Sequence, residues 1–204
     1  KNASVLIKMN CKIIVVACNT ATTNAIKEIR NSFSVPVIGI EPAIKPAILN
    51  TKTNKIGVLA TEMTLTSNLF NQTSNKFSDN IEIIEQIGFG LVNLIEKGNI
   101  NKENTKQLLK SYIDPMLDSN IDQLVLGCTH YHFLIPIIRQ IIPEKITIQD
   151  PNKAIAKQIK KILKSENLEN SLKSNYKNKV YANGNTEIIN TIINSNGEVN
   201  SLDF

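Results

Sequence analysis

The chain of 204 residues is 42% hydrophobic, which is enough to fill one large core or two small ones and argues against a disordered or fibrous protein. No apolar run approaches the length of a membrane-spanning helix, and the N-terminal residues lack the order of a signal peptide, so we expect a cytoplasmic protein with no membrane partner. The net charge is +5, but the lysines are dispersed and aromatic residues make up only 5%, so nucleic-acid binding is not expected as a primary role.

Short apolar runs rich in β-branched residues alternate along the chain with longer segments of helical period. The expected strands are 12–17, 35–40, 55–60, 80–84, 123–127, 146–149 and 179–182. The expected helices are 21–31, 41–50, 63–76, 91–98, 102–116, 131–142, 152–165 and 186–193. This alternation is typical of a parallel sheet with crossover helices, so the predicted fold class is α/β.

Two stretches divide the chain: one is polar, and at the other the amino-acid composition changes. Residues 50–54 are typical of a link to a second unit, and residues 143–151 mark a return to the first. We therefore expect a discontinuous first α/β domain, 1–50 plus 151–204, and a second α/β domain, 51–150. Within the first, Pro46 predicts that the helix 41–50 either begins after that residue or is kinked.

Two segments 110 residues apart share one layout: a buried strand, a small residue, a cysteine, and then hydrogen-bonding side chains. The first cysteine is Cys18, followed by Asn19 and Thr20; the second is Cys128. A small residue before each cysteine permits a tight turn from strand to helix. Ligands bind at the carboxyl ends of parallel strands, so we expect each cysteine to face a cleft shared by two units.

Two such thiols suit the inversion of a carbon next to a carboxylate. That reaction needs a base on one face and an acid on the other, and a helix N-terminus is expected to lower the pKa of each thiol. Asn19, Thr20 and Thr129 are candidates for holding the carboxylate, and His130 for tuning or relaying a proton. Glu96 is a further candidate proton partner. No glycine-rich phosphate loop or lysine stands beside these motifs, so no cofactor is expected.

Simpler interpretations remain for several of these residues. A lone buried cysteine is usually a small apolar side chain, and we assign that role to Cys11. The sequence Cys128-x-His130-x-His132 could bind zinc in a hydrolase, but the spacing is unusual and the other cysteines lie far upstream, so no metal is expected. Thr61 and Thr64 are most simply helix caps. Glu96 could equally be a surface charge at a helix end, and His130 a structural side chain.

Four segments carry a resemblance to a known family: residues 15–22, 36–42, 56–61 and 126–131. At these positions the sequence resembles the glutamate racemases, which supply D-glutamate for bacterial peptidoglycan. The resemblance runs from about residue 12 to residue 182. Aspartate and hydantoin racemases share the paired cysteines, but the residues around them here are similar to the glutamate branch.

The resemblance implies two pseudo-symmetric domains, each a mainly parallel sheet flanked by helices, with the active site between them. It implies glutamate as substrate and no cofactor, and it leaves a homodimer open. The catalytic cysteines fall on Cys18 and Cys128, and the proton-relay carboxylate falls on Glu96. The family's substrate-contacting groups fall on Asn19, Thr20, Thr61, Thr64, Thr129 and His130.

The sequence also departs from the family. The family's first strand with its Asp-Ser turn, and a later Pro-Tyr-Gly segment, have no counterpart here, so we expect an N-terminally truncated relative. The carboxylate that accompanies the first cysteine is then missing, and the alternative function is a catalytically incomplete remnant. His132 replaces the usual proline, and residues 183–185 replace a Gly-Asp pattern; we expect both changes to act locally.

Overall fold

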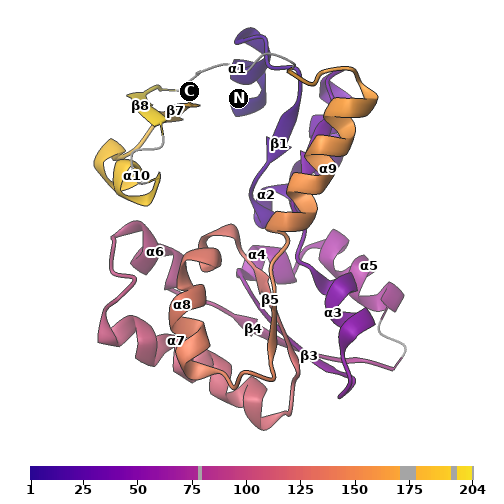
Figure 1. Cartoon of the computed structure of the whole chain (residues 1–204), viewed down its shortest axis with the longest axis vertical. Helices are drawn as coiled ribbons and strands as arrows, with labels where there is room; N and C mark the ends of the chain where they lie inside the picture. The colour runs from indigo at the N-terminus through magenta and orange to yellow at the C-terminus, as the bar shows by residue number, and fades with distance from the viewer. Residues whose placement is uncertain (78–79, 171–177, 194–196, 204) are drawn as a thin grey trace.

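The computed structural model describes residues 1–77, 80–170, 178–193 and 197–203. Strands and helices alternate along it, and every strand pair is parallel, which confirms the predicted α/β class (Figure 1). The strands are β1 (Ile14–Val16), β2 (Val37–Gly39), β3 (Lys55–Ala60), β4 (Glu82–Ile87), β5 (Gln123–Gly127), β6 (Thr147–Gln149), β7 (Asn178–Ala182) and β8 (Gly197–Ser201). The helices are α1 (Asn2–Lys8), α2 (Asn19–Ser32), α3 (Ile44–Asn50), α4 (Glu62–Leu65), α5 (Asn68–Phe77), α6 (Leu91–Glu96), α7 (Glu103–Asp118), α8 (Ile135–Ile141), α9 (Asn152–Ser165) and α10 (Thr186–Ile193), with a 3-10 helix η1 (Thr129–Leu134) before α8.

The largest sheet has the strand order β4-β3-β5-β6 and helices on both faces (Figure 1). Val58 and Ala60 of β3 belong to a core with α3, α4 and α5, whereas Leu59 belongs to a core with α6, α7 and α8. Successive side chains of a strand point to opposite faces, so covering both faces requires an uninterrupted apolar run. This requirement explains why the β3 and β5 segments were readily predicted as buried strands.

Two smaller sheets complete the described chain. β1 pairs with β2, packed by α1 and α2, and β7 pairs with β8 beside α10. The predicted apolar stripe of α9 is present, but none of its residues is fully buried. Among the described residues, no helix combines the length and apolar character needed to cross a membrane.

Several predicted boundaries were wrong, each for a local reason. The strand predicted at 80–84 is β4, which begins and ends later. The single helix predicted at 63–76 is divided into α4 and α5, because the Ser67 hydroxyl accepts a hydrogen bond from the Phe70 amide and so caps a new helix. The helix predicted at 131–142 is the 3-10 helix η1 followed by α8, which has a proline in its first turn.

The helix predicted at 41–50 does not start after Pro46. Helix α3 begins at Ile44, so Pro46 is its third residue. The first amides of a helix have no partner within the helix, and the missing N–H of Pro46 therefore costs no helical hydrogen bond. Ala43, Ile44 and Ala47 pack in the core beneath the largest sheet. Whether the first domain extends to residue 50 stays a prediction.

Asp122 fixes the linker that precedes β3. One carboxylate oxygen accepts a hydrogen bond from the Thr51 hydroxyl at 2.6 Å, and the other accepts the amides of Lys52 and Thr53. Partial burial acts to raise the pKa of Asp122, but these hydrogen bonds together outweigh it, and the pKa is lowered. The ionised form is therefore the one that holds residues 51–53 onto the start of β5.

In Asp122→Asn, the free energy of unfolding is expected to fall less steeply as the pH is lowered than in the wild type. Because the folded pKa lies below the unfolded value, the Asp122 contribution is present above the unfolded carboxyl pKa and is lost as the pH falls through the folded one. Urea unfolding at several pH values measures this loss. Asp118→Asn, at an exposed helix end, is the matched control and should follow the wild type. A variant of Asp122 that loses stability in acid as steeply as the wild type would contradict the account.

Candidate active site

Cys18 and Cys128 occupy the same backbone setting in two different parts of the fold. Cys18 follows β1 and is the N-cap of α2, with φ −145° and ψ 119°; Cys128 follows β5 and is the N-cap of η1, with φ −142° and ψ 134°. Both are free thiols; Cys18 is exposed and Cys128 is half-buried. The predicted strand–cysteine–helix layout is confirmed for both.

Thr22 fixes the first turn of α2 on the β1–β2 sheet. Its side chain is fully buried, and its hydroxyl donates to the Val16 carbonyl at 3.2 Å and accepts from the Ile40 amide at 3.1 Å. Gly39 makes room for it, since a Cβ there would lie 2.5 Å from Thr22 Cγ2. Asn19 and Thr20, in the same turn, are thereby held at the carboxyl end of β1.

Small residues bring the ends of β3 and β5 close together. Gly127 is in register with Ala60, and a Cβ on Gly127 would lie 2.5 Å from the Ala60 Cβ. Thr61 is the residue after β3, and Cys128 is the residue after β5. The two therefore begin neighbouring loops at one edge of the largest sheet.

Three threonine hydroxyls join the two sheet units at this edge. Thr20 Oγ1 lies 2.8 Å from Thr61 Oγ1 and 3.1 Å from Thr64 Oγ1, and the last two are 2.9 Å apart. Thr61 does occupy the N-cap position of α4, but its hydroxyl makes no capping bond. The expectation that Thr61 and Thr64 serve simply as caps was therefore wrong. Their hydroxyls contact the α2 turn that follows Cys18.

His130 lies between Cys128 and Glu96. Its Nδ1 is 3.9 Å from the Cys128 sulfur, and its Nε2 is 3.1 Å from Glu96 Oε1. Glu96 ends α6, and α6 packs against η1, which brings two residues 34 positions apart into contact. The arrangement can pass a proton between the thiol and the carboxylate through the imidazole ring.

Burial raises the pKa of the Cys128 thiol. The nearby negative charges of Cys18 and Glu96 raise it further, whereas hydrogen bonds from the backbone amides of His130 and Tyr131 act to lower it. The lowered pKa expected for a thiol at a helix start was wrong for Cys128, because desolvation exceeds the effect of the two amides.

Asn19 presents an unpaired amide beside Cys128. Its side chain is only 2% exposed, and neither its oxygen nor its nitrogen has a hydrogen-bond partner in the described part of the chain. A buried amide without partners is costly, so it favours a ligand with both a donor and an acceptor. The small cavity that it faces is lined by Asn19, Leu126, Cys128, Thr129, His132, Asp150, Pro151 and Asn152.

Asp150 and Asn152 belong to this cavity and were not predicted. Both follow β6, which pairs with β5, so the carboxyl-edge rule that singled out Cys128 applies to them as well. Their surroundings in the sequence carry no repeated motif, and only the strand order brings them to the cysteine.

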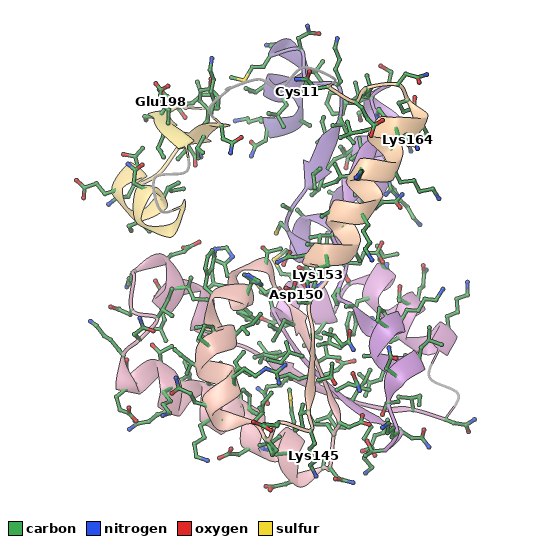
Figure 2. The ribbon with its side chains drawn as sticks, in the orientation of Figure 1. Cys11, Lys145, Asp150, Lys153, Lys164 and Glu198 are labelled. Carbon is green, nitrogen blue, oxygen red and sulfur yellow. The ribbon has the colours of Figure 1, made fainter. Side chains whose placement is uncertain are left out.

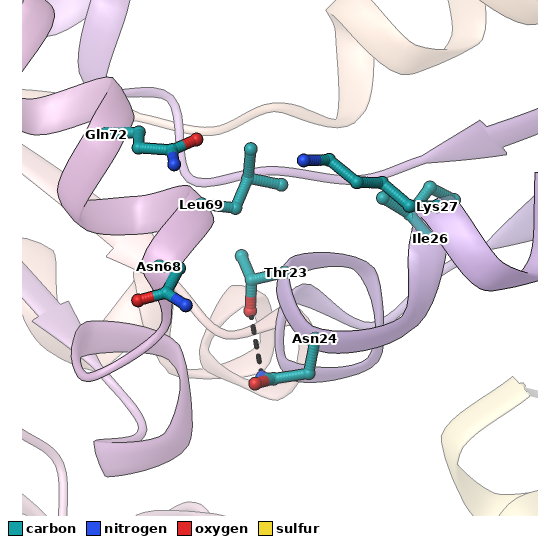
Figure 3. A pocket seen from close by; sticks show the side chains of 7 residues that line it. All are labelled: Thr23, Asn24, Ile26, Lys27, Asn68, Leu69 and Gln72. Atoms are coloured by element: carbon teal, nitrogen blue, oxygen red, sulfur yellow. Dashed lines mark hydrogen bonds between the residues drawn. The ribbon is translucent and has the colours of Figure 1, made fainter.

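Larger cavities lie elsewhere. One of about 280 Å³ lies between α2 and α5, where Lys27, Asn68 and Gln72 point toward a common space and Asn24 donates to Thr23 (Figure 3). Another of about 660 Å³ lies by the start of β5 and β6. Neither contains a cysteine or histidine. The cysteine site is therefore marked by its chemistry and not by its size.

The two histidines do not converge on a metal site with Cys128. His130 contacts Glu96, whereas His132 contacts Asp150. Across the described ranges, no three histidine, cysteine or acidic side chains are grouped so that they could hold a metal ion. The geometry offers no support for the zinc hydrolase alternative.

Tyr131 is expected to stabilise the loop after Cys128. It is fully buried, its hydroxyl donates to the Gly88 carbonyl at 3.0 Å, and burial raises its pKa so that the hydroxyl stays protonated. Tyr131→Phe removes this bond and leaves the Gly88 carbonyl with only the 3.3 Å bond from the Leu91 amide, so it should lower the free energy of unfolding by about 0.5–1.5 kcal/mol in urea titrations. Tyr112→Phe removes a similar bond to the Phe89 carbonyl at an exposed position and should cost less. Equal losses in the two variants would contradict the assignment.

Comparison with known proteins identifies the family. Residues 2–159 match the model of the Asp/Glu/Hydantoin racemase family. A glutamate racemase of Ralstonia pickettii is 43% identical over 166 residues, 81% of this chain and 59% of the relative, and one of Clostridium perfringens is 40% identical over 169 residues, 82% of this chain and 65% of the relative. The chain thus spans about three fifths of the length of such curated relatives.

Solved structures agree with the sequence relatives. Glutamate racemase RacE1 of Bacillus anthracis is similar with a TM-score of 0.86 at 27% identity, covering 100% of this chain and 78% of that chain. The Escherichia coli glutamate racemase gives a TM-score of 0.84 at 29% identity, covering 98% and 77%. The chain belongs to the Asp/Glu/Hydantoin racemase family, with glutamate racemases among its relatives in both sequence and fold.

Proposed function

We propose that this protein is a glutamate racemase that interconverts L- and D-glutamate without a cofactor, using Cys18 and Cys128 as the two proton-transferring groups. The observation that carries the proposal is the matched setting of the two thiols, each the N-cap of a helix at the end of a parallel strand, with Asn19, the neighbour of Cys18, lining a cavity together with Cys128. Inversion at the α-carbon requires this kind of symmetry, because either enantiomer must find a base on one face and an acid on the other.

Glutamate as substrate is supported by the relatives. The Escherichia coli enzyme was solved with L-glutamate and the activator UDP-MurNAc-ala, and the Francisella tularensis glutamate racemase with D-glutamate. The latter is similar to this chain with a TM-score of 0.82 at 25% identity, covering 98% of this chain and 77% of that chain. We extend the substrate, and a cytoplasmic role in supplying D-glutamate for peptidoglycan, to this protein as part of the proposal.

The proposed reaction moves one proton off the α-carbon and another onto its opposite face. One cysteine, as thiolate, takes the α-proton, and the other, as thiol, donates its proton to the resulting carbanion. The raised pKa of Cys128 favours its thiol form, which is the form that donates a proton. His130 and Glu96 then provide a route by which Cys128 recovers a proton.

Substrate binding is assigned to the polar groups that surround the thiols. The unpaired amide of Asn19 can donate to a carboxylate and accept from an ammonium group, which an amino acid offers on adjacent atoms. The remaining contacts are proposed for the hydroxyls and imidazole at the same edge: Thr20, Thr61, Thr64, Thr129 and His130.

Three other parts of the account stay predictions. They are the discontinuous first domain formed by 1–50 and 151–204, the second domain 51–150, and a homodimer. The catalytically incomplete remnant is the alternative function. It is less favoured, because the threonine cluster and the Cys128–His130–Glu96 contacts are in place. An aspartate racemase would differ in the length of side chain that the site accepts.

Circular dichroism of L- and D-glutamate solutions tests the proposal directly. The protein should remove the optical signal of both enantiomers and leave that of aspartate largely unchanged at equal concentration. Cys11→Ser, which lies seven residues before Cys18 and does not line the cavity beside Cys128, is the matched cysteine control and should racemise glutamate at the wild-type rate. A purified, folded protein that leaves both glutamate signals constant would overturn the assignment, and turnover of aspartate alone would replace it.

A further inference from the structure

His132 makes contacts that the proposed reaction does not use. It lies in η1, four residues after Cys128, and its Nδ1 is 3.1 Å from Asp150 Oδ2 and 3.2 Å from Asn152 Nδ2. Asp150 and Asn152 flank Pro151, where the chain passes from β6 to α9; Figure 2 shows Asp150 below the first turn of α9, near Lys153. The imidazole thus links η1 to residues 150–152, which form the passage from β6 to α9.

One ring nitrogen cannot serve both neighbours at once. With a proton on Nδ1 it donates to the Asp150 carboxylate, and without one it accepts from the Asn152 amide. Either bond holds the passage, since Pro151 between the two has a fixed φ of −72° and transmits the position of one neighbour to the other. His132 can therefore hold residues 150–152 whether or not Nδ1 carries a proton.

The same side chains form a wall of the cavity beside Cys128. His132, Asp150 and Asn152 line it together with the thiol and with Asn19, whose buried amide is unpaired among the described residues. The titratable groups that line the cavity are Cys128, His132 and Asp150. Moving the passage therefore changes the space available between the thiol and the amide.

We propose that His132 is a positioning residue, which clamps the β6–α9 passage through Asp150 or Asn152 and so sets the fit of the substrate between Cys128 and Asn19. The identity of that substrate rests on the proposed function, whereas the clamp itself does not. The clamp acts through the passage, so His132 is not assigned a proton-transfer step.

Nitrogen NMR of the histidine rings tests the contact itself. The chain has two histidines, so long-range proton–nitrogen spectra contain two rings to compare. Asp150→Asn should move the nitrogen signals of His132 and leave those of His130, and Glu96→Gln should do the reverse. A His132 signal unmoved both by Asp150→Asn and by Asn152→Ala overturns the clamp, whether or not the protein racemises glutamate.

Alkylation of Cys128 tests positioning without substrate. His132→Phe keeps a ring but removes both nitrogens, and iodoacetamide should then modify Cys128 about tenfold faster, relative to Cys11 in the same sample by mass spectrometry. His132→Asn keeps a hydrogen-bonding group near the place of Nδ1 and should restore most of the wild-type rate. Unchanged alkylation of Cys128 in the phenylalanine variant overturns the positioning role.

Steady-state kinetics separates this inference from the proposed function. His132→Phe should raise KM for glutamate about tenfold and leave kcat within about threefold, with the asparagine variant between it and the wild type. A normal KM in the phenylalanine variant overturns positioning while racemase activity stands. A wild-type protein without turnover overturns the racemase assignment alone, and the NMR and alkylation results then decide the clamp.

Discussion

Cys128→Ser is expected to reduce racemisation of glutamate by about a thousandfold, and Cys18→Ser by a similar factor. A serine hydroxyl is a far weaker acid than a thiol, so it can neither supply a proton at the rate of Cys128 nor form the base on the other face. Each enantiomer requires both groups, so each single variant should lose activity in both directions. The measurement is kcat for L- and for D-glutamate, followed by circular dichroism.

The third cysteine provides the control for this experiment. Cys11 follows α1 and precedes β1, and it lines none of the cavities described here. Cys11→Ser should keep wild-type kcat for both enantiomers. If Cys18→Ser racemised as fast as Cys11→Ser, the pairing of Cys18 with Cys128 would be wrong.

Gly127→Ala is expected to cause a large loss of stability through a single added methyl group. The new Cβ would lie 2.5 Å from the Ala60 Cβ and 3.4 Å from the Ala60 Cα, so relieving the clash requires the paired strands to move apart. Overpacking of this kind costs about 3 kcal/mol in free energy of unfolding, measured by urea titration. Because Cys128 is the next residue, kcat should fall as well.

Gly184→Ala is the matched glycine control. No heavy atom lies within 4 Å of a Cβ built there, so the added methyl group meets open space. The free energy of unfolding should stay within about 0.5 kcal/mol of the wild type. A Gly127 variant as stable as the Gly184 variant would show that the strand ends are not closely packed.

The central parts of the fold were predictable because their pattern is local. The apolar runs of β3 and β5 are buried on both faces, so nearly every residue in them lies in an apolar environment. The two predicted spans match the strands. β8 was not predicted, because Gly197–Ser201 is mostly polar and has no apolar run to mark it. The division between α4 and α5 depends on one serine hydroxyl, and the periodicity of apolar residues gives no sign of it.

In the candidate site, too, the residues with a local motif were predictable, and the contacts between distant segments were not. Cys18 and Cys128 are recognisable from their local layout, whereas Glu96 was only one candidate until the family resemblance supported it, since its contact with His130 spans 34 positions. The hydroxyl bonds from Thr20 to α4 arise from packing between two units and have no sequence period. The raised pKa of Cys128 depends on burial, which a motif does not specify.

The fate of the α-proton during racemisation in D₂O is the most direct test of the two-thiol account. Starting from L-glutamate, proton NMR with chiral separation should find deuterium in the D-glutamate from the first turnovers, while the remaining L-glutamate keeps its proton. This is expected because the thiol that donates on the second face carries solvent deuterium, and the thiol that removes the proton does not return it. Deuterium entering the recovered L-glutamate as fast as D-glutamate forms would mean that one base serves both faces, and would contradict the assignment of Cys18 and Cys128.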